Sequence, residues 1–239
     1  MKRLFIFIIL CCFIFTGCSK NTTADVVAEK QADSTNIDLQ VVKEIESLEN
    51  VNDLSDETIK SLSIISRTNL MNETQKKINE NYTPKNKKIY ELVKQTENQI
   101  LIDENNSQSE NFKIENQKEE TWIKEIKKGD ILKFLNKNKI KLSSTSNIKP
   151  EKDEFGKTTK LNLNGKIVSF EKIMKEFNLP SNNIEYIENN LTNIKIYGKG
   201  QKNDQVFNIF EAEKLSKQGF GYEKILKNSQ NNFQIITRK

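Results

Sequence analysis

Residues 160–169 read Lys-Leu-Asn-Leu-Asn-Gly-Lys-Ile-Val-Ser, and they set the fold class of the distal half of the chain. Leu161 and Leu163 alternate with polar residues before Asn164-Gly165, and the chain leaves through Ile167; Asn-Gly is the strongest short-range signal of a β-hairpin turn. The next eight residues, Phe170–Phe177, have apolar side chains at helical spacing and end before Pro180. A hairpin followed directly by a helix indicates antiparallel strands mixed with helices.

Further segments of the distal half show either the alternation typical of a strand or the spacing typical of a helix. The alternation of lysine with Ile140 and Leu142 predicts a strand over residues 137–142. Other strands are expected at 193–197, 205–209 and 233–237, and helices at 130–136, 210–217 and 222–227. We therefore expect an α+β domain over residues 121–239, with antiparallel hairpin strands rather than a wound parallel sheet.

The region before this domain, residues 37–102, has apolar residues at helical spacing throughout, which predicts a small bundle of short helices. Ser55 is expected to cap a helix with an acidic first turn, and Thr83-Pro84 to open another. The expected buried stripes are Val41, Val42, Ile45 and Leu48, then Ile59, Leu62, Ile65 and Leu70, then Ile89, Leu92, Val93, Thr96 and Ile100. Residues 103–120 are almost all polar and predict a linker between the two regions.

The start of the chain has a basic end followed by an apolar run. Met1-Lys2-Arg3 precedes uninterrupted Leu, Ile, Phe and Cys over residues 4–15, which is typical of an export signal. A helix that spans a membrane permanently needs about 20 apolar residues, so this run is too short for that purpose. The run ends in Phe15-Thr16-Gly17-Cys18, where two small residues precede a cysteine.

Residues 1–18 resemble the signal peptide of bacterial lipoproteins. The resemblance implies that residues 1–17 are removed, that the sulfur of Cys18 carries a diacylglycerol, and that the new amino end receives a further fatty acid such as palmitate. Phe15, three residues before the cysteine, is more typical of spirochaete-type signals. Ser19 favours the outer membrane or cell surface, by resemblance to sorting rules in other bacteria. The alternative is an ordinary secretory signal in which Cys18 is incidental.

The composition narrows the chemistry that the mature chain can perform. Its 239 residues include no histidine, and its three cysteines are Cys11 and Cys12 inside the signal and Cys18. Histidine-dependent triads, imidazole-ligated metals and disulfides are therefore excluded. Neither Gly198-Lys199-Gly200 nor Gly219-Phe220-Gly221 continues into a phosphate-binding loop. We expect no enzyme, no metal and no cofactor.

Charge is distributed unevenly along the chain. Residues 21–125 contain 13 Lys/Arg and 21 Asp/Glu, whereas residues 126–239 contain 22 and 12. A candidate basic surface, with Trp122 and Phe134 nearby, consists of Lys127, Lys128, Lys133, Lys137, Lys139 and Lys141. Such a surface would fit an anionic polymer or an acidic protein patch. The alternative is that these lysines only solvate the surface. Nucleic acid is not expected as a partner of an exported protein with almost no arginine.

These observations predict a protein of the bacterial envelope that is held to a membrane by lipid. Residues 18–36 are small and polar and predict a lipidated flexible tether. The expected function is that of a non-enzymatic binding or interaction module, exposed at the cell surface. The alternative function is that of a periplasmic accessory subunit of an envelope complex, or of a wall-binding protein. Protease treatment of intact cells distinguishes the two, because only a surface protein is digested without lysis.

Overall fold

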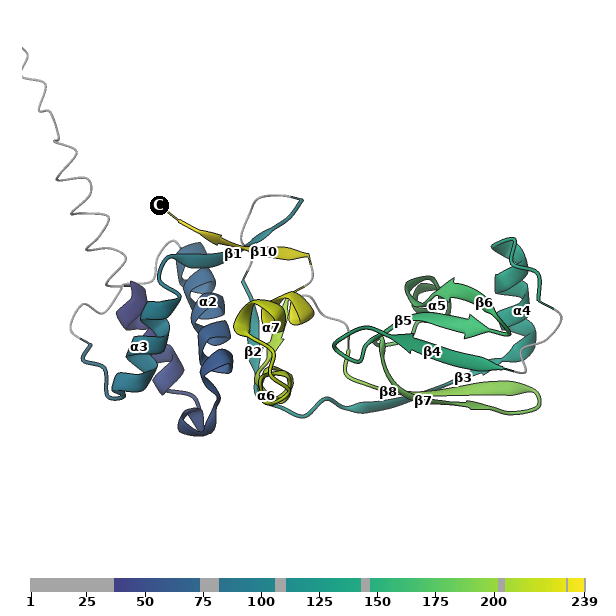
Figure 1. Ribbon diagram of the computed structural model, residues 1–239, viewed down its shortest axis with the longest axis horizontal. Coiled ribbons are helices and arrows are strands. Elements are labelled where there is room, and N and C mark those ends of the chain that lie inside the picture. The colour runs from purple at the N-terminus through teal and green to yellow at the C-terminus, as the bar shows by residue number, and fades with distance from the viewer. Residues whose placement is uncertain are drawn as a thin grey trace, which may run out of the picture.

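A computed structural model describes residues 37–73, 82–105, 111–142, 147–201, 205–230 and 232–238 of this chain. They form two lobes that lie next to each other along the longest axis of the molecule (Figure 1). The terminal lobe contains the described residues from 37 to 115 and from 205 to 238. The inserted lobe contains those from 121 to 199. The signal peptide, Cys18 and the tether lie outside the described residues.

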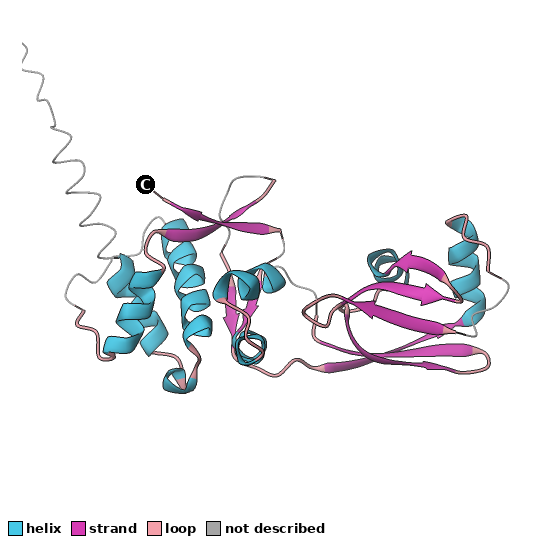
Figure 2. Cartoon of the chain, in the orientation of Figure 1, coloured by secondary structure: helices cyan, strands magenta, loops and turns pink. Residues whose placement is uncertain are grey.

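The terminal lobe is mainly helical (Figure 2). Its elements are a helix over residues 37–46, the short η1 (Val51–Asp53), α2 (Asp56–Asn72), α3 (Lys87–Gln95), β1 (Gln99–Asp103), β2 (Lys113–Glu115), β9 (Val206–Asn208), α6 (Ile209–Lys217), α7 (Tyr222–Ser229) and β10 (Phe233–Thr237). The apolar side chains expected to be buried in residues 37–102 are almost all buried in this lobe. The long helix α2 lies at the centre of the core that they form. The helical region expected near the N-terminus is therefore present.

Helix α3 begins later than the sequence indicated. Its N-cap is Asn86, whose side-chain oxygen accepts hydrogen bonds from the backbone N–H groups of Lys88 and Ile89, whereas Thr83-Pro84 lies before the helix. The helix also ends earlier, because Asn98 adopts a left-handed conformation with φ of 62°. Ile100, the last member of the expected stripe, is buried in strand β1 instead.

Segments from both ends of the described chain build the terminal lobe. Strand β1 pairs antiparallel with β10, and β2 pairs parallel with β9. The core cluster around α2 includes Phe207 and Leu226. Residues 205–238, which the sequence assigned to a domain over 121–239, thus pack with the N-terminal helices. The expected linker also contributes to this core, because Phe112 is buried and its ring lies 5.0 Å from that of Phe233.

The inserted lobe consists of two three-stranded antiparallel sheets and two helices. The sheets have the orders β3-β8-β7 and β4-β5-β6. The bounds are β3 (Thr121–Lys127), α4 (Lys128–Lys137), β4 (Ile148–Lys152), β5 (Thr158–Leu163), β6 (Lys166–Ser169), α5 (Phe170–Phe177), β7 (Asn183–Asn189) and β8 (Asn193–Lys199). Side chains from both sheets and both helices share one apolar core. The α+β class and the antiparallel hairpin strands are confirmed.

Local predictions for this lobe are confirmed at the hairpin and wrong at residues 137–142. Asn164 and Gly165 have φ of 51° and 84°, which are the left-handed conformations that a tight hairpin turn requires. Residues 137–142 form no strand, because α4 continues to Lys137 and Lys139 then takes φ of 60°. Ile140 and Leu142 still pack on the core, while Lys139 and Lys141 are exposed.

The lobes also contact each other through the turn between β4 and β5. The ring of Phe155 lies 5.2 Å from that of Phe220, and Glu154 forms an ion pair of 2.6 Å with Lys224. Lys157 Nζ donates a hydrogen bond to the carbonyl of Asn228. Besides the two chain crossings, these three contacts of the β4–β5 turn with α7 and with Phe220 just before it hold the inserted lobe against the terminal lobe.

Candidate binding surface

The six lysines of the predicted basic surface follow helix α4 from one end to the other. Lys127 and Lys128 lie at the junction of β3 and α4, where the backbone N–H of Lys128 donates a hydrogen bond to the carbonyl of Thr192. The remaining four, Lys133, Lys137, Lys139 and Lys141, lie further along α4 or just beyond its end. The structure thus brings the six lysines onto one helix and its flanks, as their proximity in sequence implied.

Two of these lysines have their charge compensated. Lys133 Nζ lies 3.1 Å from the Asp130 carboxylate, and Lys137 Nζ lies 3.7 Å from the Glu176 carboxylate. Both pairs are exposed, so each contributes little to stability, but each lowers the local positive potential. The remaining four lysines form no ion pair within the described ranges. The uncompensated charge therefore lies at the two ends of α4.

The two aromatic residues expected beside this surface have packing roles instead. Phe134 is buried, and its ring meets that of Phe177 edge to face at 5.7 Å. Trp122, at the start of β3, lies against Gly198 and donates a hydrogen bond from Nε1 to Ser181 Oγ at 3.2 Å. These aromatic rings stabilise the inserted lobe and do not form a platform for a ligand.

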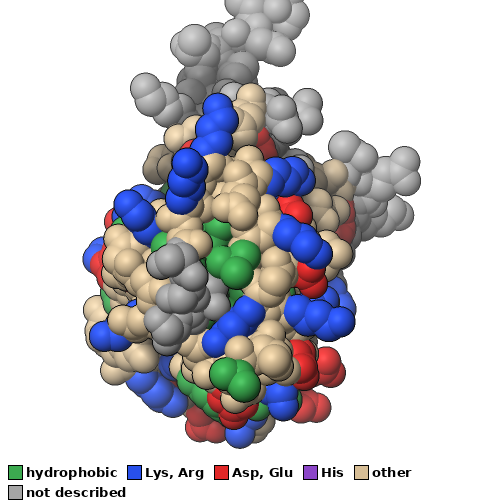
Figure 3. Space-filling view, turned by 90° about the vertical axis from the view of Figure 1, so that its right-hand side faces the viewer, with side chains coloured by type: hydrophobic (Ala, Val, Ile, Leu, Met, Phe, Trp, Pro, Cys, Tyr) green, Lys and Arg blue, Asp and Glu red, His purple; other side chains and the backbone are tan. Residues whose placement is uncertain are grey.

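The end of the inserted lobe that points away from the terminal lobe carries residues that sequence reasoning missed. We call it the distal end and define it by Lys127, Lys128, Lys149, Lys166 and the turn between β7 and β8, residues 190–192. Lys149 lies near the start of β4, and Lys166 follows the β5–β6 turn. Ile148 pairs with Leu163, and Leu163 with Lys166, so these positions share one end of their sheet. Figure 3 shows this face, where basic side chains, with some acidic ones among them, surround a few apolar side chains.

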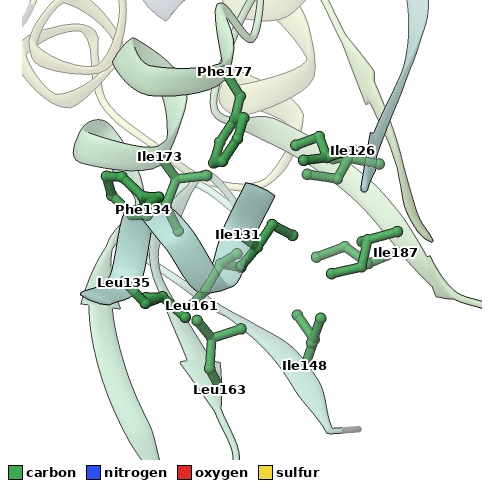
Figure 4. A pocket seen from close by; sticks show the side chains of 12 residues that line it. Ile126, Ile131, Phe134, Leu135, Ile148, Leu161, Leu163, Ile173, Phe177 and Ile187 are labelled. Carbon is green, nitrogen blue, oxygen red and sulfur yellow. The ribbon is translucent and has the colours of Figure 1, made fainter. Parts of the chain in front are cut away.

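The core behind the distal end contains a small apolar cavity. Its volume is about 20 Å³, and the twelve side chains that line it are all apolar (Figure 4). They come from both sheets and both helices, and Ile126, Ile148, Leu163 and Ile187 lie near the distal ends of their strands. A cavity of this size has room for about one water-sized group. It is therefore a packing defect of the core rather than a site for a whole ligand.

Acidic residues lie close together in the sequence at two places, Glu151 to Glu154 and Glu211 to Glu213, and members of both groups have structural partners. Asp153 accepts hydrogen bonds from the backbone N–H groups of Phe155 and Lys157 in the β4–β5 turn. Glu211 pairs with Lys214. Burial raises the pKa of Glu213, but hydrogen bonds from Ser55 and Thr58 outweigh that effect, and its pKa is lowered. None of these groups faces another carboxylate across the small apolar cavity.

Glu119 has a raised pKa and lies where the chain crosses between the lobes. Burial is the main cause, and the nearby carboxylate of Glu211 adds to it. One oxygen accepts a hydrogen bond of 2.8 Å from Asn183 Nδ2, and the other packs against Gly200. This environment is a structural contact between the two crossing segments. In the described part of the chain, no group of three or more acidic residues is arranged to hold a metal ion.

Comparison of the chain with models of known protein families and with curated proteins gives no match. Of the helices that the structure describes, none has the length and apolar character needed to cross a lipid bilayer.

Proposed function

We propose that this chain is a lipid-anchored lipoprotein of the bacterial envelope that acts as a non-enzymatic binding module. The observation that carries the proposal is the sequence Phe15-Thr16-Gly17-Cys18 at the end of an apolar run that is too short to span a membrane. Two or more acyl chains on Cys18 would hold the protein at the membrane stably. The anchor favours the outer membrane or the cell surface.

The charge of the inserted lobe supports a binding role. Residues 121–199 contain 16 lysines and 9 acidic residues, whereas residues 37–115 and 205–238 together contain 15 basic and 18 acidic ones. The positive charge is thus concentrated in the lobe that is inserted between two segments of the other. An excess of one sign on one lobe attracts partners of the opposite sign and steers their approach. The partner is therefore an anionic polymer, an anionic surface or an acidic patch of another protein.

Metabolic labelling with palmitate tests the anchor. The wild-type protein should incorporate label and partition into the detergent phase of a phase separation, and Cys18→Ala should do neither. Cys12→Ala, which changes a cysteine inside the signal, is the matched control and should retain the label. A wild-type protein that takes up no label, or a Cys18→Ala protein that retains it, would contradict the proposal.

A further inference from the structure

The distal end combines an exposed apolar side chain with lysines. Leu191, in the turn between β7 and β8, is 93% exposed, more than any other large hydrophobic residue of the described ranges. Lys127 pairs in register with Asn193, and the N–H of Lys128 bonds to the carbonyl of Thr192. Both lysines are therefore held beside the turn that carries Leu191.

The sheet β4-β5-β6 contributes further lysines and an apolar side chain at the distal end. Lys149 and Lys166 are exposed, and neither forms an ion pair within the described residues. Ile148 of this sheet and Ile187 of β7, which line the small cavity, are half-buried. The distal end thus has apolar side chains at its centre and, around them, lysines that lack ion-pair partners in the described part of the chain. This arrangement is complementary to a surface that has anionic groups on the outside and an apolar layer beneath them.

We propose that the distal end docks on the surface of an anionic lipid bilayer. The four lysines would contact lipid head groups, and Leu191 would enter the boundary between head groups and acyl chains. A soluble anionic polymer would use the lysines but would leave Leu191 exposed, so the apolar group favours the bilayer. A single bound fatty acid is disfavoured because the cavity, at about 20 Å³, is too small to hold an acyl chain.

This contact would be separate from the lipid on Cys18. The distal end lies at the far side of the inserted lobe from the terminal lobe, where the described chain begins at residue 37 (Figure 1). The protein would thus touch lipid through the distal end as well as through the fatty acids on Cys18. Because the distal end acts without the fatty acids, protein that lacks them should still bind.

Sedimentation with vesicles tests the proposal on residues 19–239, which retain every described residue and carry no lipid. The probe is a vesicle of phosphatidylglycerol and phosphatidylcholine, compared with one of phosphatidylcholine alone. The wild-type protein should sediment with the first and not with the second. Lys127→Gln together with Lys128→Gln should weaken binding by about tenfold or more, since each lysine near an anionic surface contributes about fivefold.

Two matched variants keep the test specific. Lys160→Gln with Lys172→Gln removes the same charge from exposed positions on β5 and α5 that form no ion pair within the described residues; Lys160 pairs with Ser169, at the end of the sheet away from the β5–β6 turn, and this variant should change binding less than twofold. Leu191→Ser should weaken binding severalfold, whereas Ile123→Ser, at a position 64% exposed in β3, should not. The thermal midpoint of each variant verifies that it is folded.

The proposal is overturned by any of three results. The wild-type protein fails to bind anionic vesicles, the two lysine pairs weaken binding equally, or Leu191→Ser binds as well as Ile123→Ser does. The first result together with retention on a heparin matrix would assign the lysines to a soluble polymer. The outcome is independent of palmitate labelling, because the protein used here has no Cys18.

Discussion

The carboxylate of Glu213 on α6 accepts hydrogen bonds from both the backbone N–H and the hydroxyl of Ser55, at 2.9 and 2.8 Å. The hydroxyl of Thr58 donates a third at 2.9 Å. Ser55 is the N-cap of α2, yet its side chain makes no capping bond within its own helix. An acidic residue from the C-terminal part of the chain therefore completes the first turn of an N-terminal helix.

Glu213→Ala should lower the free energy of unfolding by about 1–2 kcal/mol at neutral pH, because it leaves these donors without an acceptor. The pKa of Glu213 is lowered from 4.5 in the folded state, so its contribution is present above that value and is lost as the pH falls below it. Urea unfolding at several pH values measures the effect. The difference from wild type should shrink in acid, and a difference that grows there would contradict this account.

Glu223→Ala is the matched control for that prediction. Glu223 is exposed, and its hydrogen bond within the described residues comes from the hydroxyl of Tyr222, at 3.4 Å. Its removal should change the free energy of unfolding by less than about 0.5 kcal/mol. An equal loss in both variants would mean that a general charge effect, rather than the contact with Ser55, stabilises α2.

Asp38 and Arg67 form a buried ion pair that links the first described helix to α2. The distance from Arg67 Nη2 to Asp38 Oδ1 is 2.8 Å, and both side chains are at most 3% exposed. Asp38→Asn should cost about 3–5 kcal/mol, since it leaves a buried cation without its main partner. Asp56→Asn, which removes the exposed partner of Lys88, should cost less than about 1 kcal/mol in the same unfolding experiment. Similar losses in the two variants would contradict the role given to burial.

Gly198→Ala should destabilise the inserted lobe by about 1–3 kcal/mol. A Cβ atom at this position would lie 2.3 Å from Cζ2 of Trp122, so the indole ring would have to move. Trp122 is the only tryptophan, and its fluorescence therefore reports on the change together with the thermal midpoint. Gly129→Ala, in α4 with no atom within 4 Å of the added carbon, should be neutral or slightly stabilising. An unchanged emission spectrum in Gly198→Ala would contradict the proposed packing.

Retention on a heparin matrix should fall when Lys137, Lys139 and Lys141 are all replaced by glutamine. Because Lys137 already pairs with Glu176, most of the effect should come from Lys139 and Lys141. The measurement is the salt concentration at which each protein elutes. Replacement of Lys85, Lys87 and Lys88 on the terminal lobe removes the same charge and should shift elution less. Equal shifts would show that net charge alone determines retention.

The sequence pattern correctly predicted the helices and strands in which apolar residues recur at regular spacing. Phe170–Phe177 is helix α5 and Phe233–Thr237 is strand β10, as the pattern indicated. Strand β7 was missed because a bulge between Ile184 and Tyr186 breaks its alternation. Strand β4 was missed because it contains Pro150, which is tolerated since β4 lies at the edge of its sheet.

The placement of whole segments could not be read from local patterns. The pairing of Gln99 with Thr237 joins residues that are far apart in sequence, and nothing near either residue specifies its partner. For the same reason the lysines of α4 could be grouped from the sequence, whereas Lys149, Lys166 and Leu191 could not. Only the order of strands in the two sheets brings these three to the distal end.

Thr121 faces Lys199 across β3 and β8, so the inserted lobe begins and ends at one place. A ribosome delivers the helices of residues 37–95 early and their partners in residues 205–238 last. The nascent inserted lobe can complete its own core while the apolar sides of the early helices are still uncovered. The helices of residues 37–95 are therefore made early but are the last to have their apolar sides covered, so their exposure during synthesis lasts until residues 205–238 are complete.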